Sequence, residues 1–537
     1  MSILSGAWRG FSSRQGVVQL LQGQRWEHYS QYNFTQKTGS TTDKESTASE
    51  SSTSPDLGCD TLWVDQPVDQ YNQQGSGFWQ QRVHVCTGFW GKGPNEPLFF
   101  YAGDEGAVEK PFPTMFSDWA QQDGGLLVYA EHRYYGESMP QGASSLTAAG
   151  IQWLAAEQAI ADYVGALRYV RQASVAQLYQ VPSSAPAVAY GGSYGGMLAA
   201  YLRLFYPDDF DVSVAMSAPV KYLVPTNTFK RGIYDSFEVL TQAVQDAGGS
   251  DCSEAISLGF QTLADLADSQ EGRSQLEEAV GFCTTGVLES PESVNMLADT
   301  LRDAWWGLFQ YLNDTKDTLT IYSACQLMQP SPSGADNGLA AVRGLGQFYL
   351  LKINSGSSTQ QIDCLSPDVL QPFYTQIETT QNTPPEARSY NYQGCHEGFP
   401  RAFDFLSSTA KGSIFGDGSF DWEAYVAWCQ YEFGLRYVSL PPKYLVYDED
   451  TYSSATNIVF TNGGYDPWSA GSVLQDLSSS VVAIVTPRTS HCFHIRPAQP
   501  ETDSPEMTAA RAQIVTYVQQ MLASGRRKLL SNRRLLG

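Results

Sequence analysis

A strand-like run, a pair of glycines, a serine and a helical run follow one another in residues 187–205. Residues 188–190 are apolar and read as a buried strand, and residues 197–205 have the composition of a helix. Gly191-Gly192-Ser193-Tyr194-Gly195 lies between them. A G-x-S-x-G pattern at a strand-to-helix turn is typical of a nucleophile elbow, which exposes the serine beside a helix N-terminus. Short patterns of this kind also arise by chance, so the alternative is a glycine-rich turn with an exposed serine.

A serine nucleophile needs a histidine base, and the chain contains only six histidines. In α/β-hydrolases the triad follows the order serine, acid, histidine along the chain. Three histidines follow Ser193 and satisfy that order: His396, His491 and His494.

Two strand-like segments near the C-terminus each lead into a polar residue that suits a triad. Residues 457–460 run into a glycine-rich turn that ends at Asp466, and residues 481–485 run into a turn that ends at His491. Both residues therefore follow strand ends, where parallel sheets place their sites. Taken singly, Asp466 is also compatible with a plain Asp-Pro turn and His491 with a structural loop histidine. In the correct order on successive strands, they predict a catalytic triad of Ser193, Asp466 and His491.

The pattern along the chain predicts an α/β-hydrolase fold that is interrupted by a helical cap. Strands alternate with helices from about residue 80 to 220, and a further strand follows at residues 213–219. Helical periodicity then dominates before the strand pattern resumes and ends in a helix at residues 507–522. The helical segments of the insertion are expected at residues 232–247, 252–266, 293–312 and 339–352. The resulting organisation is a disordered N-terminal segment (1–57), a first hydrolase part (58–225), the cap (226–430), a second hydrolase part (431–525) and a basic disordered tail (526–537).

Seven separate segments of the chain resemble one family of serine peptidases. This family includes prolyl carboxypeptidase, dipeptidyl peptidase II and thymus-specific serine protease. The matching segments cover residues 65–72, 78–82, 97–106, 130–138, 191–196, 392–395 and 462–468. The resemblance implies a serine exopeptidase that acts on peptides after proline near a chain end, without a cofactor. Whether a C-terminal residue or an N-terminal dipeptide is released stays open, because the family contains both activities.

The resemblance also separates the two neighbouring histidines. The family motif has its base at the position of His491, whereas His494 stands where the family usually has aspartate. We therefore expect His494 to lie beside the site or at the surface. A second departure is Gln70, where a histidine is more usual.

Further site residues follow from the loops after the early strands. The oxyanion hole is expected to use the backbone amide of Tyr194 and one from Gly103 or Asp104, in the loop after residues 98–102. Glu105 is a candidate for binding a substrate ammonium or tuning the histidine, with a solvated turn carboxylate as the alternative. Trp468 is expected to contribute, together with Tyr194, to an apolar pocket for proline. The charged residues in 131–136 are expected to form an internal ion-pair network rather than to contact substrate, because unpaired charges beside a buried strand are costly.

The net charge indicates which classes of partner are excluded, and the cysteine content indicates the cellular compartment. The net charge of −23 leaves no basic face for nucleic acid. No apolar run is long enough to span a membrane. Nine cysteines without a C-x-x-C pair predict disulfides, five of those cysteines lie in residues 252–395, and Cys492 is expected to be the free thiol. Together with the sequons at Asn33 and Asn313, the cysteines favour the secretory pathway, with a lysosome, a vacuole or the extracellular space as destination. No metal site is expected, and a homodimer is among the expected states.

Two other functions are compatible with these residues. An esterase or lipase uses the same fold and triad, because fold does not determine substrate. A non-catalytic binding protein on a hydrolase scaffold is the alternative from another class, although such proteins typically lose a triad residue and this chain has all three. Labelling with a fluorophosphonate distinguishes a peptidase or esterase, which reacts, from a non-catalytic binding protein, which does not.

Overall fold

An eight-stranded mixed sheet organises the fold. The computed structural model describes residues 56–72, 77–222, 236–311, 320–328, 336–355, 362–370, 385–397, 413–416, 422–435 and 447–535. The strands are β1 (Cys59–Pro67), β2 (Phe78–Cys86), β3 (Leu98–Ala102), β4 (Leu126–Ala130), β5 (Ala187–Gly192), β6 (Val212–Met216), β7 (Ile458–Gly463) and β8 (Val481–Thr486). Their order across the sheet is β1-β2-β4-β3-β5-β6-β7-β8.

The direction of the strands brings distant parts of the sequence to one edge of the sheet. β1, β2 and β4 pair antiparallel, whereas β4, β3, β5, β6, β7 and β8 are all parallel to one another. β3, β4, β5, β6 and β7 are fully buried, as expected for strands covered on both faces. The loops that follow β3, β5, β7 and β8 therefore meet at the carboxyl edge of the sheet, where ligand sites form in open α/β sheets.

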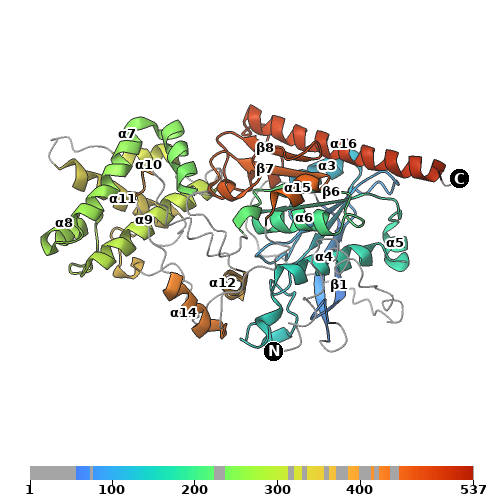
Figure 1. Cartoon of the computed structure of the whole chain (residues 1–537), viewed down its shortest axis with the longest axis horizontal. Helices are drawn as coiled ribbons and strands as arrows, with labels where there is room; N and C mark the ends of the chain where they lie inside the picture. Colours follow the sequence, from blue (N-terminus) through green and yellow to red (C-terminus); the bar gives the residue numbers. More distant parts are fainter. Residues whose placement is uncertain are drawn as a thin grey trace.

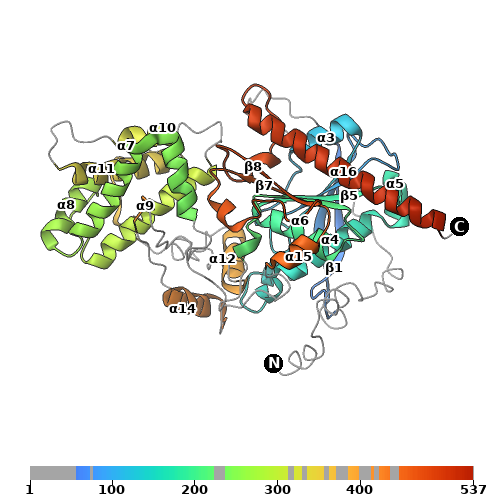
Figure 2. The same ribbon diagram turned by 45° about the horizontal axis from the view of Figure 1, so that its top comes forward.

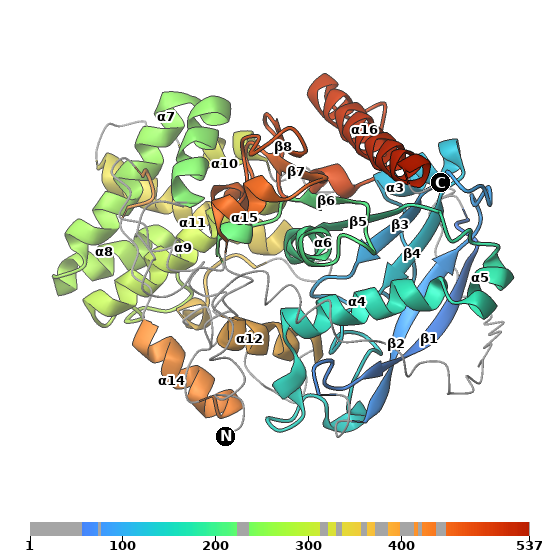
Figure 3. The same cartoon turned by 45° about the vertical axis from the view of Figure 1, so that its right-hand side comes forward.

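Helices cover both faces of this sheet (Figure 3). One face packs against α4 (Ala156–Val170) and α6 (Ser193–Phe205), and the other packs against α3 (Met115–Asp123) and α16 (Pro505–Leu535). Figure 2 shows α16 crossing the sheet diagonally. Two shorter helices complete this part: α5 (Ala173–Tyr179) and α15 (Glu449–Ser454). The strand order, the parallel core and the two helical layers define an α/β-hydrolase fold, as the sequence predicts.

A block of helices lies beside the sheet (Figure 1). It comprises α7 (Ser236–Leu266), α8 (Gln270–Val280), α9 (Pro291–Tyr311), α10 (Ile321–Leu327) and α11 (Asn337–Ser355), which share one hydrophobic core. Two further helices, α12 (Pro385–Glu397) and α14 (Trp422–Phe433), pack together against the loop after β4. Helices thus interrupt the sheet between β6 and β7 along the chain.

The element boundaries agree with the sequence prediction in one place and differ in another. Separate helices were expected at residues 232–247 and 252–266, and α7 (Ser236–Leu266) consists of two helical stretches that meet at a kink at Gly249. Gly249 has a φ of 78°, which glycine adopts without strain. α16 continues to Leu535, beyond residue 525, where the basic tail was expected to begin. The expected N-terminal segment and both sequons lie largely or wholly outside the described residues.

Four disulfides confirm the expectation from the cysteine count. Cys59–Cys86 joins β1 to β2, Cys252–Cys325 joins α7 to α10, and Cys395–Cys429 joins α12 to α14. The fourth disulfide, Cys283–Cys364, closes a segment of the helical block. Cys492 is the free cysteine, as predicted.

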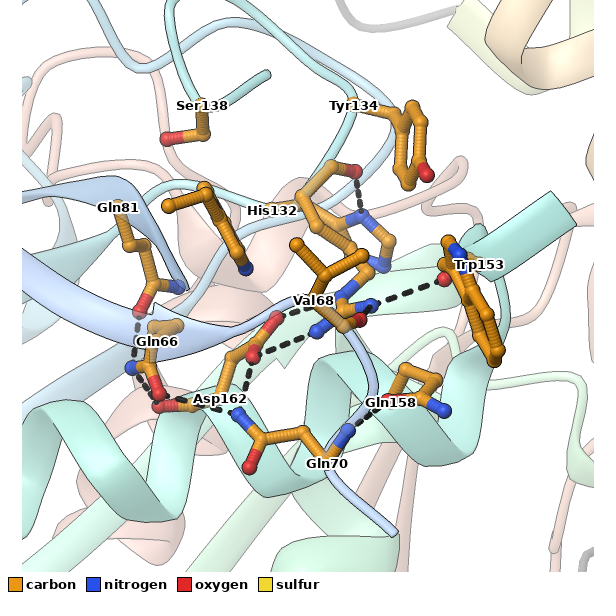
Figure 4. Close-up of polar contacts among 12 residues, drawn as sticks. Gln66, Val68, Gln70, Gln81, His132, Tyr134, Ser138, Trp153, Gln158 and Asp162 are labelled. Carbon is orange, nitrogen blue, oxygen red and sulfur yellow. Dashed lines mark hydrogen bonds and ion pairs between the residues drawn. The ribbon is translucent and has the colours of Figure 1, made fainter. Parts of the chain in front are cut away.

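Buried ion pairs hold the loop after β4, which confirms the predicted network. Figure 4 shows the polar contacts around Asp162. Arg133 donates to both oxygens of Asp162 at 2.6 and 2.8 Å, and both side chains are fully buried. Gln70, at the position where the family usually has histidine, donates to the same carboxylate at 2.6 Å. Glu131 forms a second ion pair with Arg82 and accepts backbone N–H groups from Val108 and Ser138. Each buried charge thus has a partner, which offsets its desolvation.

Candidate active site

The G-x-S-x-G segment forms the predicted strand-to-helix turn. β5 ends at Gly192, α6 begins at Ser193, and Ser193 has a φ of 54°. A positive φ is rare for a residue with a side chain and is often found where a site requires strain. A Cβ atom on Gly191 would overlap the carbonyl oxygen of Gly195, and one on Gly195 would lie 2.7 Å from the carbonyl oxygen of Ala102. The turn therefore requires glycine on both sides of the serine.

Asp466 and His491 are joined by a buried hydrogen-bonded pair. The Nδ1 atom of His491 lies 2.9 Å from each carboxylate oxygen of Asp466. Asp466 has no exposed surface, and His491 is 8% exposed. Because a carboxylate accepts, Nδ1 carries a proton in either charge state, and in the neutral imidazole Nε2 is the proton acceptor. Burial lowers the pKa of His491, but Asp466 and Cys492 together raise it by more, so that the pKa lies well above its usual value.

The histidine loop rests directly against the serine turn. A Cβ atom on Gly192 would lie 2.9 Å from Sγ of Cys492, the residue after His491. The backbone N–H of Cys492 donates to the hydroxyl of Ser217 at 2.9 Å. The loops that carry Asp466 and His491 also touch, because a Cβ atom on Gly463 would lie 2.5 Å from the carbonyl oxygen of Ser490. The structure thus brings all three predicted triad residues to the ends of β5, β7 and β8.

The other two histidines that follow Ser193 are held elsewhere. His494 is fully buried, and its Nε2 atom lies 2.7 Å from the hydroxyl of Thr486. Of its two expected places, the surface is therefore wrong, because its imidazole packs inside the molecule with Thr486. A place beside the site stays a prediction. Burial and the nearby Arg511 lower the pKa of His494 to about 3, which keeps it neutral. His396 stacks on Tyr392 in α12, and burial lowers its pKa to about 4.

We expect His494→Ala to reduce stability but to retain at least about a tenth of the activity, since His494 bonds to Thr486 and not to Asp466. The loss of stability follows from the unpaired Thr486 hydroxyl and the cavity. Urea unfolding and steady-state kinetics on the same preparation separate the two effects. Thr486→Val, which removes the other partner, provides the control. An inactive His494→Ala variant beside an active His491→Ala variant would reverse the assignment.

The loop after β3 lies beside the first turn of α6, where an oxyanion hole was expected. Cβ of Asp104 lies 3.4 Å from the Cβ position of Gly195, and Tyr194 is the second residue of α6, in the turn whose amides point out of the helix end. The backbone N–H of Gly103 is instead bonded to the carbonyl oxygen of Ala130 at 3.1 Å. Gly103 is therefore excluded as a donor, because the sheet already uses its amide. The two amides that the geometry leaves as candidates are those of Tyr194 and Asp104.

The side chain of Tyr194 is held in place by the loop after β4. The Nδ1 atom of His132 lies 2.6 Å from the carbonyl oxygen of Arg133 and therefore carries the proton. The Nε2 atom consequently accepts from the hydroxyl of Tyr194 at 3.2 Å. Burial and the neighbouring Arg133 lower the pKa of His132 to about 3, so this neutral tautomer persists at physiological pH.

Glu105 lies within the electrostatic reach of the site. Burial and the nearby charge of Asp104 raise the pKa of Glu105 to about 8, and the charge of His491 acts in the opposite direction. A carboxyl group with such a pKa is neutral over much of the physiological range and ionises when a cation approaches.

Aromatic rings surround Trp468 on the side of His491. Trp468 follows Asp466 in the short 3₁₀ helix Pro467–Gly471, and its ring centre lies 6.1 Å from that of His491. The ring centre of Trp306, in α9, lies 4.9 Å from that of Trp468, and the ring centre of Tyr222 lies 5.6 Å from it. Sequence reasoning predicted Trp468 but missed Trp306 and Tyr222, which no local motif marks. Tyr465 also reaches the cap, because its hydroxyl donates to Asp246 of α7.

An α/β-hydrolase sheet with a serine elbow and a paired aspartate and histidine on the following strands defines the class of serine hydrolases. The model of the serine carboxypeptidase S28 family matches residues 66–514, and the chain therefore belongs to this family of serine peptidases. In the described part of the chain, no helix is long and apolar enough to cross a bilayer. The same residues contain no group of three or more potential metal ligands.

Curated relatives match along most of their length. A lysosomal Pro-X carboxypeptidase from Bos taurus is 28% identical over 86% of this chain and 87% of its own. A thymus-specific serine protease from Mus musculus is 30% identical over the same two shares. Among solved structures, an esterase aligns with 88% of this chain and 85% of its own at 10% identity, with a TM-score of 0.32.

The shifted pKa values predict that the folded protein loses stability between pH 6.5 and 8. Glu105 titrates near 8 in the folded state against 4.5 in a model peptide, so its contribution is present at low pH and is lost as pH rises toward 8. The raised pKa of His491 acts in the same direction. Buried neutral histidines such as His132 and His494 oppose this only below pH 6.5, because they cost stability when the unfolded chain is protonated.

From Glu105 alone, we expect the free energy of unfolding to fall by about 2 kcal/mol between pH 6.5 and 8, which is about 1.5 pH units at 1.36 kcal/mol each. Urea unfolding at the two pH values measures this change. Glu105→Gln removes the titrating group and should flatten the profile, whereas Glu109→Gln, an exposed neighbour, should not. Equal stability of the wild type at both pH values would contradict the prediction.

Proposed function

We propose that this protein hydrolyses peptide bonds on the carboxyl side of proline near a chain end through an acyl-enzyme. Ser193 is the nucleophile, His491 the general base and Asp466 the residue that orients it. The observation that carries this proposal is the pairing of His491 Nδ1 with Asp466, beside a strained serine turn. The names of the Pro-X carboxypeptidase relatives support the preference for proline.

The geometry supports the following course of reaction. Nε2 of His491 takes the proton from Ser193 as its oxygen attacks the carbonyl carbon. The negative charge that develops on the carbonyl oxygen is stabilised by the amides of Tyr194 and Asp104 and by the N-terminus of α6. His491 then protonates the leaving amine, and water attacks the acyl-enzyme by the same route in reverse.

The helical insertion limits which substrates reach Ser193. Trp306 and Asp246 contact the loop that carries Asp466, so α9 and α7 lie over the carboxyl end of β7. Two disulfides make this block rigid. A rigid cover beside the nucleophile excludes water and leaves room for only a short end of the substrate. The aromatic rings of Trp468, Trp306 and Tyr222 suit the apolar ring of proline, whose restricted φ lowers the ordering cost of binding.

We expect a long peptide with prolines at internal positions and second from each end to be cut only near one terminus. Mass spectrometry of the products over time identifies the bond that is cleaved. The same peptide with alanine in place of each proline is the control, and it should be cleaved far more slowly. Efficient cutting at the internal proline, or indifference to the alanine replacement, would show that the cap does not close the cleft.

An esterase on the same fold is the second candidate within the enzyme class, because the triad alone does not select amides over esters. Hydrolysis of aryl esters without hydrolysis of proline peptides would favour it. A non-catalytic binding protein would not react with a fluorophosphonate probe, whereas the paired Asp466 and His491 predict rapid labelling of Ser193.

Four disulfides and lysosomal relatives fit a protein of the secretory pathway. We propose the lysosome or vacuole as its destination, with the extracellular space as the alternative; microscopy of the tagged chain decides between them. The homodimer stays a prediction that light scattering can test.

A further inference from the structure

One face of α12 carries buried polar atoms that have no partner among the described residues. Gln393 and Glu397 lie four residues apart and therefore share this face, and they are 0% and 2% exposed. One oxygen of each is bonded to the hydrolase part: Gln393 Oε1 accepts from the hydroxyl of Tyr135, and Glu397 Oε1 accepts from the N–H of Ala156. The remaining atoms, Gln393 Nε2 and Glu397 Oε2, are buried without a hydrogen bond within the described part of the chain. Such atoms are costly to bury unless a ligand satisfies them.

Only part of this arrangement has a structural explanation. Ala155 precedes α4 and supplies no side chain to cap it, and Glu397 provides the missing acceptor at the first turn. One carboxylate oxygen is enough for that cap. The cap therefore explains Glu397 Oε1 but leaves Oε2 and the amide nitrogen of Gln393 unexplained.

Further carboxyl groups converge on the same place. The charges of Glu157 and Glu105 both act on Glu397, and Oε2 of Glu157 is likewise buried without a partner among the described residues. Burial and these neighbours raise the pKa of Glu397 well above its usual value. The charge of Glu397 also acts on Tyr194, the residue after the nucleophile, and Glu105 follows Asp104 in the oxyanion loop. Contacts also join this face to Tyr194: Tyr135, which donates to Gln393, packs its ring 5.4 Å from that of His132, and His132 accepts from the hydroxyl of Tyr194 at 3.2 Å. The polar face of α12 is thus linked to the residue that follows Ser193.

The chemistry of these atoms selects one kind of ligand. Buried carboxyl groups that repel one another gain most from a cation, and an ammonium supplies three donors to unpartnered oxygens. The amide nitrogen of Gln393 is a donor that matches a neutral carbonyl oxygen. A free N-terminus presents both groups next to each other: an α-ammonium and, two bonds farther on, the first carbonyl. A C-terminal carboxylate would instead meet like charge here, which is unfavourable.

We propose that Glu397, Glu105 and Gln393 bind the free N-terminus of the substrate, so that the enzyme releases a dipeptide that ends in proline. The carboxyl groups bind the α-ammonium, and Gln393 donates to the carbonyl of the first residue. When the leaving amine departs, the acyl part of the substrate stays bound to Ser193, beside the oxyanion loop. The acyl part is the N-terminal part of the peptide, so the N-terminus lies on the side of α12. This inference rests on the proposed function and determines which end of the chain is cut.

The test compares alanyl-prolyl-aminomethylcoumarin with its N-acetyl derivative, which lacks the ammonium. We expect the wild type to prefer the free amine in kcat/KM by about 100-fold, as for loss of a charged hydrogen-bond partner at a buried site. Glu397→Gln keeps an oxygen to cap α4 but removes the charge, and it should lower this preference about 10-fold or more. Glu105→Gln, which does not touch α4, should lower the same ratio and covers the case in which Glu397→Gln fails to fold. Glu423→Gln, an exposed carboxylate in α14, is the matched control and should leave the ratio unchanged.

Equal cleavage of the two substrates by the wild type would overturn the inference. Release of only the C-terminal residue from a peptide whose second-to-last residue is proline would also overturn it. Folded Glu397→Gln and Glu105→Gln variants that keep the wild-type ratio would also overturn it. These results leave the proposed function intact if a fluorophosphonate still labels wild-type Ser193 and proline peptides are still cut. Absence of both labelling and cleavage in the wild type would instead refute the proposed function itself.

Discussion

Purified Ser193→Ala protein will fold like the wild type and cleave proline-containing peptides about a million-fold more slowly, as when the serine of another triad is removed. The reason is that the alanine has no oxygen to attack the carbonyl, so only the oxyanion hole and substrate binding remain. His491→Ala should lose a similar factor because Ser193 then has no base. The double variant should be little worse than either single one, since the triad acts as a unit.

Single-turnover kinetics with a fluorogenic proline peptide, together with thermal unfolding, measure this result. Ser184→Ala is the matched control, because Ser184 is exposed on the loop before β5 and should retain full activity. Fluorophosphonate labelling of the wild type and of these four variants reports Ser193 independently of the substrate. Turnover of Ser193→Ala near that of the wild type would remove Ser193 from the reaction, and a far slower double variant would show that the two residues act separately.

Asp466→Asn should fold but lose about 10⁴-fold in kcat, because the histidine then holds its proton on the wrong nitrogen. In the wild type, Nδ1–H of His491 donates to Asp466, and Nε2 has no partner among the described residues. In the proposed reaction Nε2 is therefore free to take the proton of Ser193. The amide of asparagine donates to Nδ1, so the proton moves to Nε2 and the base is lost. The asparagine oxygen can still accept the N–H of Trp468, which Asp466 holds at 2.9 Å, so the loop should keep its shape.

The measurement is kcat for a proline peptide across pH, with unfolding as the check on structure. Asp476→Asn serves as the control, because Asp476 is an exposed carboxylate that bonds only to the backbone of β8 among the described residues. A variant of Asp466 that stays within tenfold of the wild type would mean that another group orients His491.

The local signals of the sequence were sufficient for most of the hydrolase part. Gly191 and Gly195 predict the turn at Ser193 because no other residue allows such close approach of strand, helix and neighbouring loop. Asp466 and His491 were predicted because each follows a buried strand. These inferences depend on interactions between residues near one another in the chain, together with the general rule that parallel strands end at one edge.

Other features depended on contacts that no local pattern reveals. The exclusion of Gly103 follows from its bond to Ala130, which exists only because β3 and β4 pair. The burial of His494 follows from the packing of its imidazole against Thr486. In both cases the sequence predicts the loop correctly. The hydrogen-bond partner of each polar group, however, depends on which residues fold next to it.

The sequence by itself determined the class of fold, the three triad residues as candidates and the free cysteine, because strand periodicity, turn glycines and residue order are local properties. Only the tertiary structure decided that Trp306 of α9 meets Trp468, and that Glu397 of α12 caps α4 across 241 residues. The physical reason is that the cap is joined to the sheet by long-range contacts. Their energies depend on burial and on the charges brought together by folding, which no spacing along the chain encodes.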